Sequence, residues 1–188
     1  MYYVSFIDDF SRNNWIYFLM KKYEVFDRFK EFKDLVENKT YKKIKVLRTD
    51  NGGEFCRNEF EEFCKKCGIA RQKTTPYTPQ QNGVAERMNM TLMEKARSML
   101  SGGGLGQEFW AEVVGTTCYL VNRSPSLALD DKTPHEVWTG KKPSLEHLRV
   151  FGCDAYVHVP KENRSKLDKK VEKCIFIGYK DGVKGYKL

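Results

Sequence analysis

Strand-like runs alternate with amphipathic helical runs through the first 120 residues, and this alternation restricts the possible folds more than any other feature. Short runs of aromatic and β-branched residues predict strands, and apolar residues at three- and four-residue steps predict helices. The expected strands are 2–7, 15–19, 44–47 and 69–72, and the expected helices are 23–38, a helix ending at Gly68, 84–100 and 109–121. The first two strands should pair as an antiparallel hairpin. Strands that alternate with helices are typical of an α/β layer fold.

The pattern changes after residue 125. A helical turn is expected at 135–138, and strands at 150–159 and 171–179. Asp181-Gly182 is a hairpin-turn dipeptide between Tyr179 and Tyr186. We therefore divide the chain into an α/β core at 1–125, a linker at 126–144 and a small β module at 145–188.

Composition narrows the class of protein. Lys and Arg number 33 against 25 Asp and Glu, and the net charge of +8 favours a polyanionic partner. Aromatic residues make up 13% of the chain, so a packed core is expected. No apolar run approaches the ~20 residues that a bilayer span needs, and no signal peptide is visible, so we expect neither a membrane protein nor a secreted one.

Six cysteines are present, and without a secretory signal they are expected to be reduced thiols. Cys64 and Cys67 have the two-residue gap of a zinc knuckle or a redox pair. A structural zinc needs two more ligands, and no second pair with suitable spacing follows. The favoured interpretation is a half-buried helix that carries two small apolar side chains.

Two acidic residues stand where a fold could direct them to one point. Asp50 follows an expected strand, and Glu86 lies in the first turn of an expected helix, with 35 residues between them. Carboxylates from a strand end and a neighbouring helix suit a hard divalent cation such as Mg²⁺. Acids at these positions are also common as solvated or capping groups, so spacing alone leaves both interpretations open.

The surrounding motifs make this pair specific. The segments TDNGGEF at 49–55 and PYTPQQNGVAERMN at 76–89 resemble the integrase core of copia-type LTR retrotransposons. The resemblance continues through FIDDFSR at 6–12, YLVNRSPS at 119–126 and FGCDAYVHVPKENRSKLD at 151–168. It implies a ribonuclease-H-like fold followed by an SH3-like β module. It also implies a polynucleotidyl transferase with three acids, of which Asp50 and Glu86 match the second and third.

The same resemblance implies the ligands and partners. Two Mg²⁺ or Mn²⁺ ions, roughly 3.5–4 Å apart, would be held by Asp50 and Glu86 with the third acid. The expected substrate is DNA, both the element's ends and the chromosomal target, which implies the nucleus and a possible homo-oligomer. The segment 76–83 is expected to be mobile, so that Glu86 settles when metal and DNA bind. The expected DNA-binding residues are Arg87, Asn82, Gln81, Lys95 and Arg97, although for Lys95 a solvated helix face is favoured.

The chain also departs from the family pattern. The strand that carries the first catalytic Asp, central in the sheet, is absent from the sequence, and Asp8 and Asp9 match other acids. The sheet should therefore show a gap, or strand 2–8 should move sideways to pair with 44–49. An integrase core that is inactive in isolation, an inert nucleic-acid-binding remnant and a protein-interaction piece remain open. The SH3-like module is expected to be incomplete.

Overall fold

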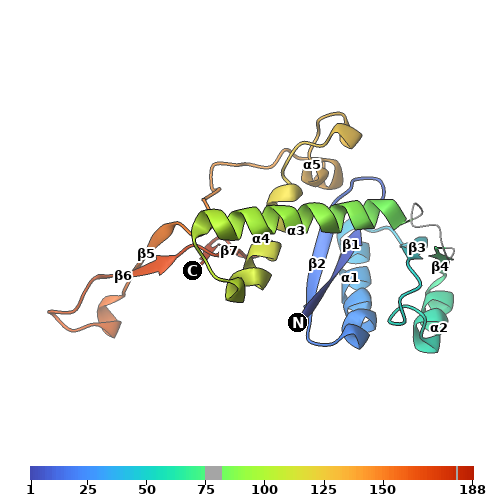
Figure 1. The fold of residues 1–188 in the computed structure, drawn as a ribbon, viewed down its shortest axis with the longest axis horizontal. Helices are drawn as coiled ribbons and strands as arrows, with labels where there is room; N and C mark the ends of the chain where they lie inside the picture. The colour runs from blue at the N-terminus through green and yellow to red at the C-terminus, as the bar shows by residue number, and fades with distance from the viewer. Residues whose placement is uncertain (75–81, 181) are drawn as a thin grey trace. The chain divides into compact units, whose positions relative to one another are not determined.

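The structure is a computed structural model that describes residues 1–74, 82–180 and 182–188. The chain forms two compact units (Figure 1). Unit 1 contains residues 1–7 and 15–90, and unit 2 contains residues 8–14 and 91–188. In the part of the chain that the structure describes, no helix is long and apolar enough to cross a membrane. The division 1–125, 126–144 and 145–188 stays a prediction.

Two pairs of strands form the sheet elements of unit 1. Strand β1 (Tyr2–Ile7) pairs with β2 (Asn14–Leu19), and β3 (Val46–Thr49) runs parallel to β4 (Ala70–Lys73). Within the described residues the two pairs share no ladder, so the sheet has a gap, which is one of the two outcomes expected from the sequence. Strand β3 begins and ends two residues later than expected. Asp50 therefore follows the strand directly.

Helix α1 (Val25–Thr40) also lies two residues later than expected, because residues Lys22–Glu24 form a separate 3-10 turn, η1. The helix ends at Tyr41, whose φ of 57° is left-handed. Helix α2 (Asn58–Cys67) ends as predicted at Gly68, whose φ of 69° suits glycine because it has no Cβ. The three- and four-residue spacing of apolar residues predicts that Leu35 lies on the core face of α1, but Leu35 is exposed. Lys33, which the pattern does not include, is buried.

A cluster of aromatic and aliphatic side chains forms the core of unit 1. The phenyl ring of Phe6 on β1 stacks on that of Phe32 on α1, with ring centres 4.6 Å apart. Phe29 stacks on Phe60 of α2 at 5.2 Å, so the cluster connects β1, α1 and α2. Its buried members are Val4, Phe6, Leu19, Val25, Phe29, Phe32, Phe60, Cys64 and Ile69. Cys64 is therefore a core residue, as the favoured interpretation of the Cys64–Cys67 pair predicts.

Helix α3 (Gly83–Gly103) begins in unit 1 and continues into unit 2. It is longer than expected, because Gly102 and Gly103 continue the helix and the chain leaves it at Gly104, with φ of 62°. Helix α4 (Trp110–Val121) follows the 3-10 turn η3 (Gln107–Phe109) and has five buried residues. The expected helical turn is present as α5 (Pro134–Thr139), after the short turn η4 (Leu127–Leu129).

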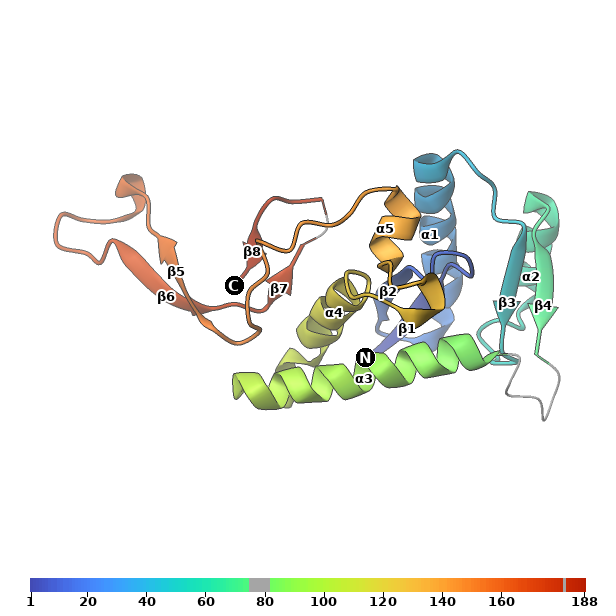
Figure 2. The same ribbon diagram turned by 90° about the horizontal axis from the view of Figure 1, so that it is seen from above.

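The C-terminal segment of unit 2 consists of two small hairpins (Figure 2). Strand β5 (Asp154–His158) pairs antiparallel with β6 (Val171–Ile175) around the turn η5 (Lys161–Asn163), and β7 (Gly178–Tyr179) pairs with β8 (Tyr186–Lys187). The expected single strand 171–179 was wrong: it is broken before Gly178. The pairing of Tyr179 with Tyr186 is confirmed, whereas Asp181 lies outside the described residues.

Gly178 explains this break. Its φ is 147°, and an added Cβ would collide with the hydroxyl of Thr116 on α4. The same Thr116 hydroxyl donates a hydrogen bond to the carbonyl of Ile177 at 3.1 Å. The strand turns at Gly178 because only glycine permits both the backbone conformation and this close approach to α4.

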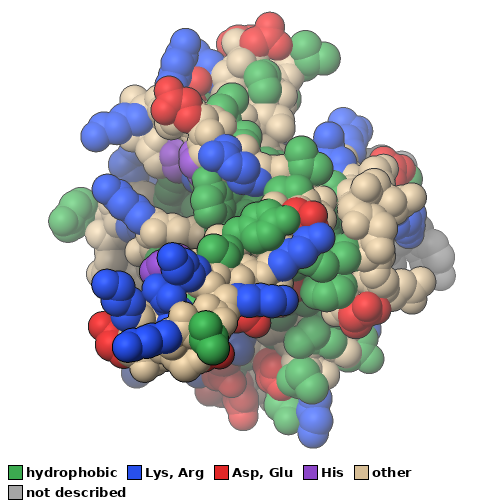
Figure 3. Space-filling view, turned by 90° about the vertical axis from the view of Figure 1, so that its left-hand side faces the viewer, with side chains coloured by type: hydrophobic (Ala, Val, Ile, Leu, Met, Phe, Trp, Pro, Cys, Tyr) green, Lys and Arg blue, Asp and Glu red, His purple; other side chains and the backbone are tan. Residues whose placement is uncertain are grey.

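The exposed surface of the β5–β6 hairpin combines apolar and cationic side chains. Tyr156, Val171 and Ile175 are exposed on one of its faces. The face shown in Figure 3, viewed from the end where β5 and β6 lie, has Lys and Arg side chains among hydrophobic ones. Segment 161–173 alone contains six Lys and Arg residues against three acids. The C-terminal segment is therefore a source of positive charge.

Candidate functional site

Asp50 lies at the carboxyl end of β3, beside the end of β4. The last ladder positions pair Thr49 with Lys73, and the Thr74 N–H continues the pairing by donating to the Thr49 carbonyl at 3.1 Å. The carboxyl edge of a parallel pair is the usual place for active-site residues in open α/β sheets. The Asp50 side chain is exposed, so its oxygens are accessible to a ligand.

In the turn after Asp50, the backbone N–H of Gly52 binds the Asp50 carboxylate. The Gly52 N–H donates to Asp50 Oδ1 at 3.0 Å, and the Phe55 N–H donates to the Gly52 carbonyl at 2.9 Å. A Cβ at Gly52 would meet Asp50 Oδ1 at 3.0 Å and Glu54 Oε2 at 2.9 Å. Gly52 therefore allows two carboxylates to approach the same backbone position. Glu54 was not singled out from the sequence, although it belongs to the TDNGGEF motif.

Glu86 is exposed on the first turn of α3. Figures 1 and 2 both show this turn beside the carboxyl ends of β3 and β4. One helical turn further on, Asn89 Oδ1 accepts a hydrogen bond from the Ser5 hydroxyl of β1 at 2.9 Å. The start of α3 is therefore attached to β1. The sequence indicates no role for Asn89, because an asparagine within a helix is an ambiguous signal.

The structure distributes the expected DNA-binding residues along α3. Arg87, Lys95 and Arg97 are exposed, and Asn82 is half-buried just before the helix. Gln81 and most of the segment 76–83, expected to be mobile, lie outside the described residues. The roles of Asp50, Glu86 and these five residues stay predictions.

Asp8 and Asp9 serve the turn between β1 and β2. Asp8 Oδ2 accepts hydrogen bonds from the Ser11 N–H at 2.8 Å and the Ser11 hydroxyl at 2.7 Å. Asp9 forms an ion pair with Arg12 at 2.6 Å. Both acids therefore have structural partners. Among residues 1–74, 82–180 and 182–188, no three His, Cys, Asp or Glu side chains lie together in a way that could hold a metal ion.

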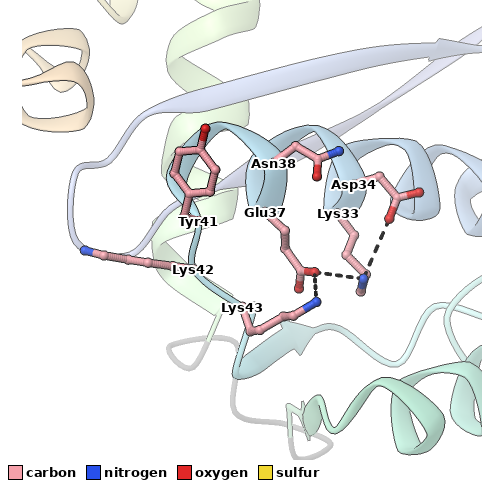
Figure 4. A pocket seen from close by; sticks show the side chains of 7 residues that line it. All are labelled: Lys33, Asp34, Glu37, Asn38, Tyr41, Lys42 and Lys43. Atoms are coloured by element: carbon pink, nitrogen blue, oxygen red, sulfur yellow. Dashed lines mark hydrogen bonds and ion pairs between the residues drawn. The ribbon is translucent and has the colours of Figure 1, made fainter.

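A second cluster of charges lies near the start of β3, where a hollow opens beside the end of α1 (Figure 4). Glu37 Oε2 accepts from the ammonium groups of Lys33 and Lys43, each at 3.0 Å, and Oε1 accepts from the Ile44 N–H at 3.0 Å. Burial raises the pKa of Glu37, but these hydrogen bonds outweigh it and hold the pKa below its usual value. With both oxygens engaged, Glu37 stabilises the chain between α1 and β3.

Two family models match parts of the chain. The retroviral polymerase SH3-like domain matches residues 153–188, and the TnsB C-terminal domain matches residues 15–102. The retrovirus-related Pol polyprotein from transposon TNT 1-94 of Nicotiana tabacum is 56% identical over 187 residues, which is 100% of this chain and 14% of that protein. The chain thus spans about a seventh of this relative's length.

Two solved structures with a similar fold are retroviral. A chain of the simian T-cell lymphotropic virus intasome, in complex with PP2A regulatory subunit B56 gamma, aligns with a TM-score of 0.61 and 17% identity, covering 91% of this chain and 61% of that chain. The HTLV-2 integrase catalytic core domain, in complex with magnesium, aligns with a TM-score of 0.53 and 21% identity, covering 70% and 80%. The chain therefore belongs to the family of retrovirus-related Pol polyproteins of copia-type transposons, and it has the ribonuclease-H-like fold of retroviral integrase cores.

Proposed function

We propose that this chain is the DNA-binding and catalytic-core segment of a transposon integrase, and that Asp50 and Glu86 are two of its metal ligands. The observation that carries the proposal is the exposure and the sparse hydrogen bonding of the Asp50 carboxylate. Its carboxylate is exposed at the carboxyl edge of β3 and β4, and its one hydrogen bond within the described residues comes from the Gly52 N–H.

The donor set fits a hard divalent cation. Carboxylate oxygens are the ligands that Mg²⁺ and Mn²⁺ prefer, and both carboxylates are exposed, so a cation can reach them from solvent. Divalent cations bound there would activate a water or a DNA 3′-hydroxyl and stabilise the departing phosphodiester oxygen. Asp50 and Glu86 would hold the cations, and the Gly52 N–H restrains the Asp50 carboxylate through its hydrogen bond to Oδ1.

Positive charge on α3 and on the C-terminal segment supports a DNA partner. Arg87, Lys95 and Arg97 are exposed cations that would contact phosphates. The side-chain amides of Asn82, just before the same helix, and of Gln81, which lies outside the described residues, would add hydrogen bonds to the DNA. Because the proposed substrates are the element's DNA ends and chromosomal target DNA, we propose that the chain acts in the nucleus. A homo-oligomer on paired DNA ends is part of the same proposal, because the intasome and the trimeric HTLV-2 core are assemblies.

Strand transfer onto target DNA tests the catalytic proposal. The assay uses duplexes that mimic the ends of the element, with Mg²⁺ or Mn²⁺, and compares this chain with a version extended upstream in the polyprotein. We expect transfer that depends on the cation in the extended version only, and we expect it to be lost when Asp50→Asn or Glu86→Gln is introduced into that version. The matched control is Asp34→Asn, an exposed acid on α1, which should leave transfer unchanged.

The outcomes distinguish an active integrase core from an inert nucleic-acid-binding remnant. DNA binding without transfer in either version identifies the inert nucleic-acid-binding remnant. If the extended version transfers DNA equally well with and without Asp50→Asn, Asp50 is excluded as a ligand. Filter binding at several salt concentrations tests the phosphate contacts, because each lost contact should reduce the salt-dependence slope by about 0.9. Arg87→Gln should show this reduction, whereas Lys95→Gln should show it only if Lys95 contacts DNA.

A further inference from the structure

Arg71 lies beneath the turn that carries Asp50, and neither composition nor motif spacing draws attention to it. It is on β4, which pairs with β3. Its Nη2 donates to the Thr49 hydroxyl at 3.2 Å and to the Phe55 carbonyl at 3.0 Å. Thr49 is the residue before Asp50, and Phe55 closes the turn that follows. One guanidinium nitrogen therefore connects both ends of the segment that bears Asp50.

The guanidinium is itself held in place by the core of unit 1. Its central carbon lies 4.6 Å from the centre of the Phe60 ring, and Phe60 is fully buried on α2. The Phe55 ring meets the same Phe60 ring edge-on, with centres 5.8 Å apart. Phe60 thus supports both the cation and one end of the turn. This arrangement suits arginine, whose planar group can stack on a ring while it donates hydrogen bonds.

The position of the hydrogen bonds has a consequence for Asp50. The Thr49 hydroxyl belongs to a residue that is 6% exposed, and without Arg71 it would lose this buried partner. The Phe55 carbonyl would lose the bond that attaches it to β4. The segment between them would then be held by the bond from Asn51 Nδ2 to the Thr74 carbonyl at 2.8 Å and by its own short-range bonds, such as Gly52 to Asp50.

We propose that Arg71 is a positioning residue, which fixes the direction in which the Asp50 carboxylate leaves the sheet by joining Thr49 to Phe55. Its role in metal binding rests on the proposed function. Its role in ordering residues 50–56 does not, so the two can be tested apart.

The first measurement is site-resolved hydrogen exchange of the Phe55 amide, with amides of α1 as an internal reference. In Arg71→Lys, which keeps the charge but loses the planar fork, exchange of this amide should accelerate about tenfold while α1 is unchanged. Thr49→Val removes one acceptor and leaves Arg71 in place, and it should show a smaller acceleration. The control is Arg48→Lys on the neighbouring strand, whose exposed side chain bonds Gln72, and it should leave the turn unchanged.

The second measurement is Mn²⁺ binding followed by electron paramagnetic resonance. Arg71→Lys should weaken binding several-fold, and Arg48→Lys should not. If the unchanged chain binds no Mn²⁺ but the exchange result holds, the proposed function fails and the ordering role stands. Equal acceleration across α2, β4 and the turn would show that Arg71 serves general packing, and it would overturn the proposal. Unchanged exchange at Phe55 in both Arg71→Lys and Thr49→Val would also overturn it.

Discussion

Glu37 and Asp50 are acids near opposite ends of β3, and their surroundings differ in every respect that matters for chemistry. Glu37 has a side chain that is 9% exposed and accepts bonds from two ammonium groups and a backbone N–H. Asp50 is exposed and, within the described residues, accepts one hydrogen bond, from the Gly52 N–H. Both oxygens of Glu37 accept hydrogen bonds that stabilise the fold, whereas the Asp50 carboxylate has lone pairs available to bind a ligand.

This contrast gives a criterion for separating structural acids from functional ones. A buried carboxylate must be compensated by donors, because an uncompensated buried charge costs several kcal/mol. An exposed carboxylate at a sheet edge contributes little to stability and can bind a cation without breaking native interactions. Substitution of Glu37 should therefore lower stability and leave metal affinity unchanged. Substitution of Asp50 should lower metal affinity and leave stability nearly unchanged.

The largest expected effect is on metal affinity. Asp50→Asn should weaken Mn²⁺ binding by more than about a hundredfold, because an amide oxygen replaces a charged ligand. Its free energy of unfolding should change by less than about 0.5 kcal/mol. Isothermal titration calorimetry and urea unfolding measure the two quantities. Substantial destabilisation by Asp50→Asn with unchanged affinity would remove the distinction between the two acids.

The next effect is on stability. Glu37→Ala should lower the free energy of unfolding by about 2 kcal/mol, because Lys33 is left buried and the Ile44 N–H loses its acceptor. Mn²⁺ affinity should be unchanged. Urea unfolding of this variant beside Glu31→Ala, an exposed acid on the same helix, provides the matched comparison. A Glu37→Ala protein as stable as Glu31→Ala would contradict the structural role of Glu37.

A smaller effect is the pH dependence of this stabilisation. The pKa of Glu37 is lowered in the folded chain from 4.5, so its contribution is present above pH 4.5 and is lost as pH falls through the lowered pKa. The Glu37 hydrogen bond raises the pKa of Lys33 above 10.5 although burial opposes it, so that contribution is present below pH 10.5 and is lost as pH rises through the raised pKa. Chemical unfolding of the unchanged chain and Glu37→Gln should therefore converge below pH 4.5. A constant difference down to pH 2 would contradict the assignment.

Sequence patterns predict the elements here better than they predict the contacts that hold the site. Periodicity identifies α1 and β3 but misplaces both by two residues. The turn η1 determines where α1 begins, and the hydrogen bond from the Ile44 N–H to Glu37 holds the chain before β3 begins. Lys33 violates the apolar pattern because its partner is one turn away on the same helix. Arg71 cannot be recognised, since its acceptors lie 22 and 16 residues away. Specific hydrogen bonds, both within α1 and between distant segments, supply details that propensities do not.

The smallest expected effect concerns the helix that carries Glu86. Ser5→Ala removes the 2.9 Å hydrogen bond from β1 to Asn89 and should cost about 1 kcal/mol of unfolding free energy, because Asn89 loses a half-buried partner. Ser98→Ala, which removes a hydrogen bond confined to α3, is the control and should cost less. If the bond between β1 and α3 positions Glu86 for the cation, Ser5→Ala should also weaken Mn²⁺ binding, by a few-fold. Unchanged affinity with the expected loss of stability would mean that Glu86 reaches the cation independently of this attachment, and that the Asp50 turn alone sets the geometry of the site.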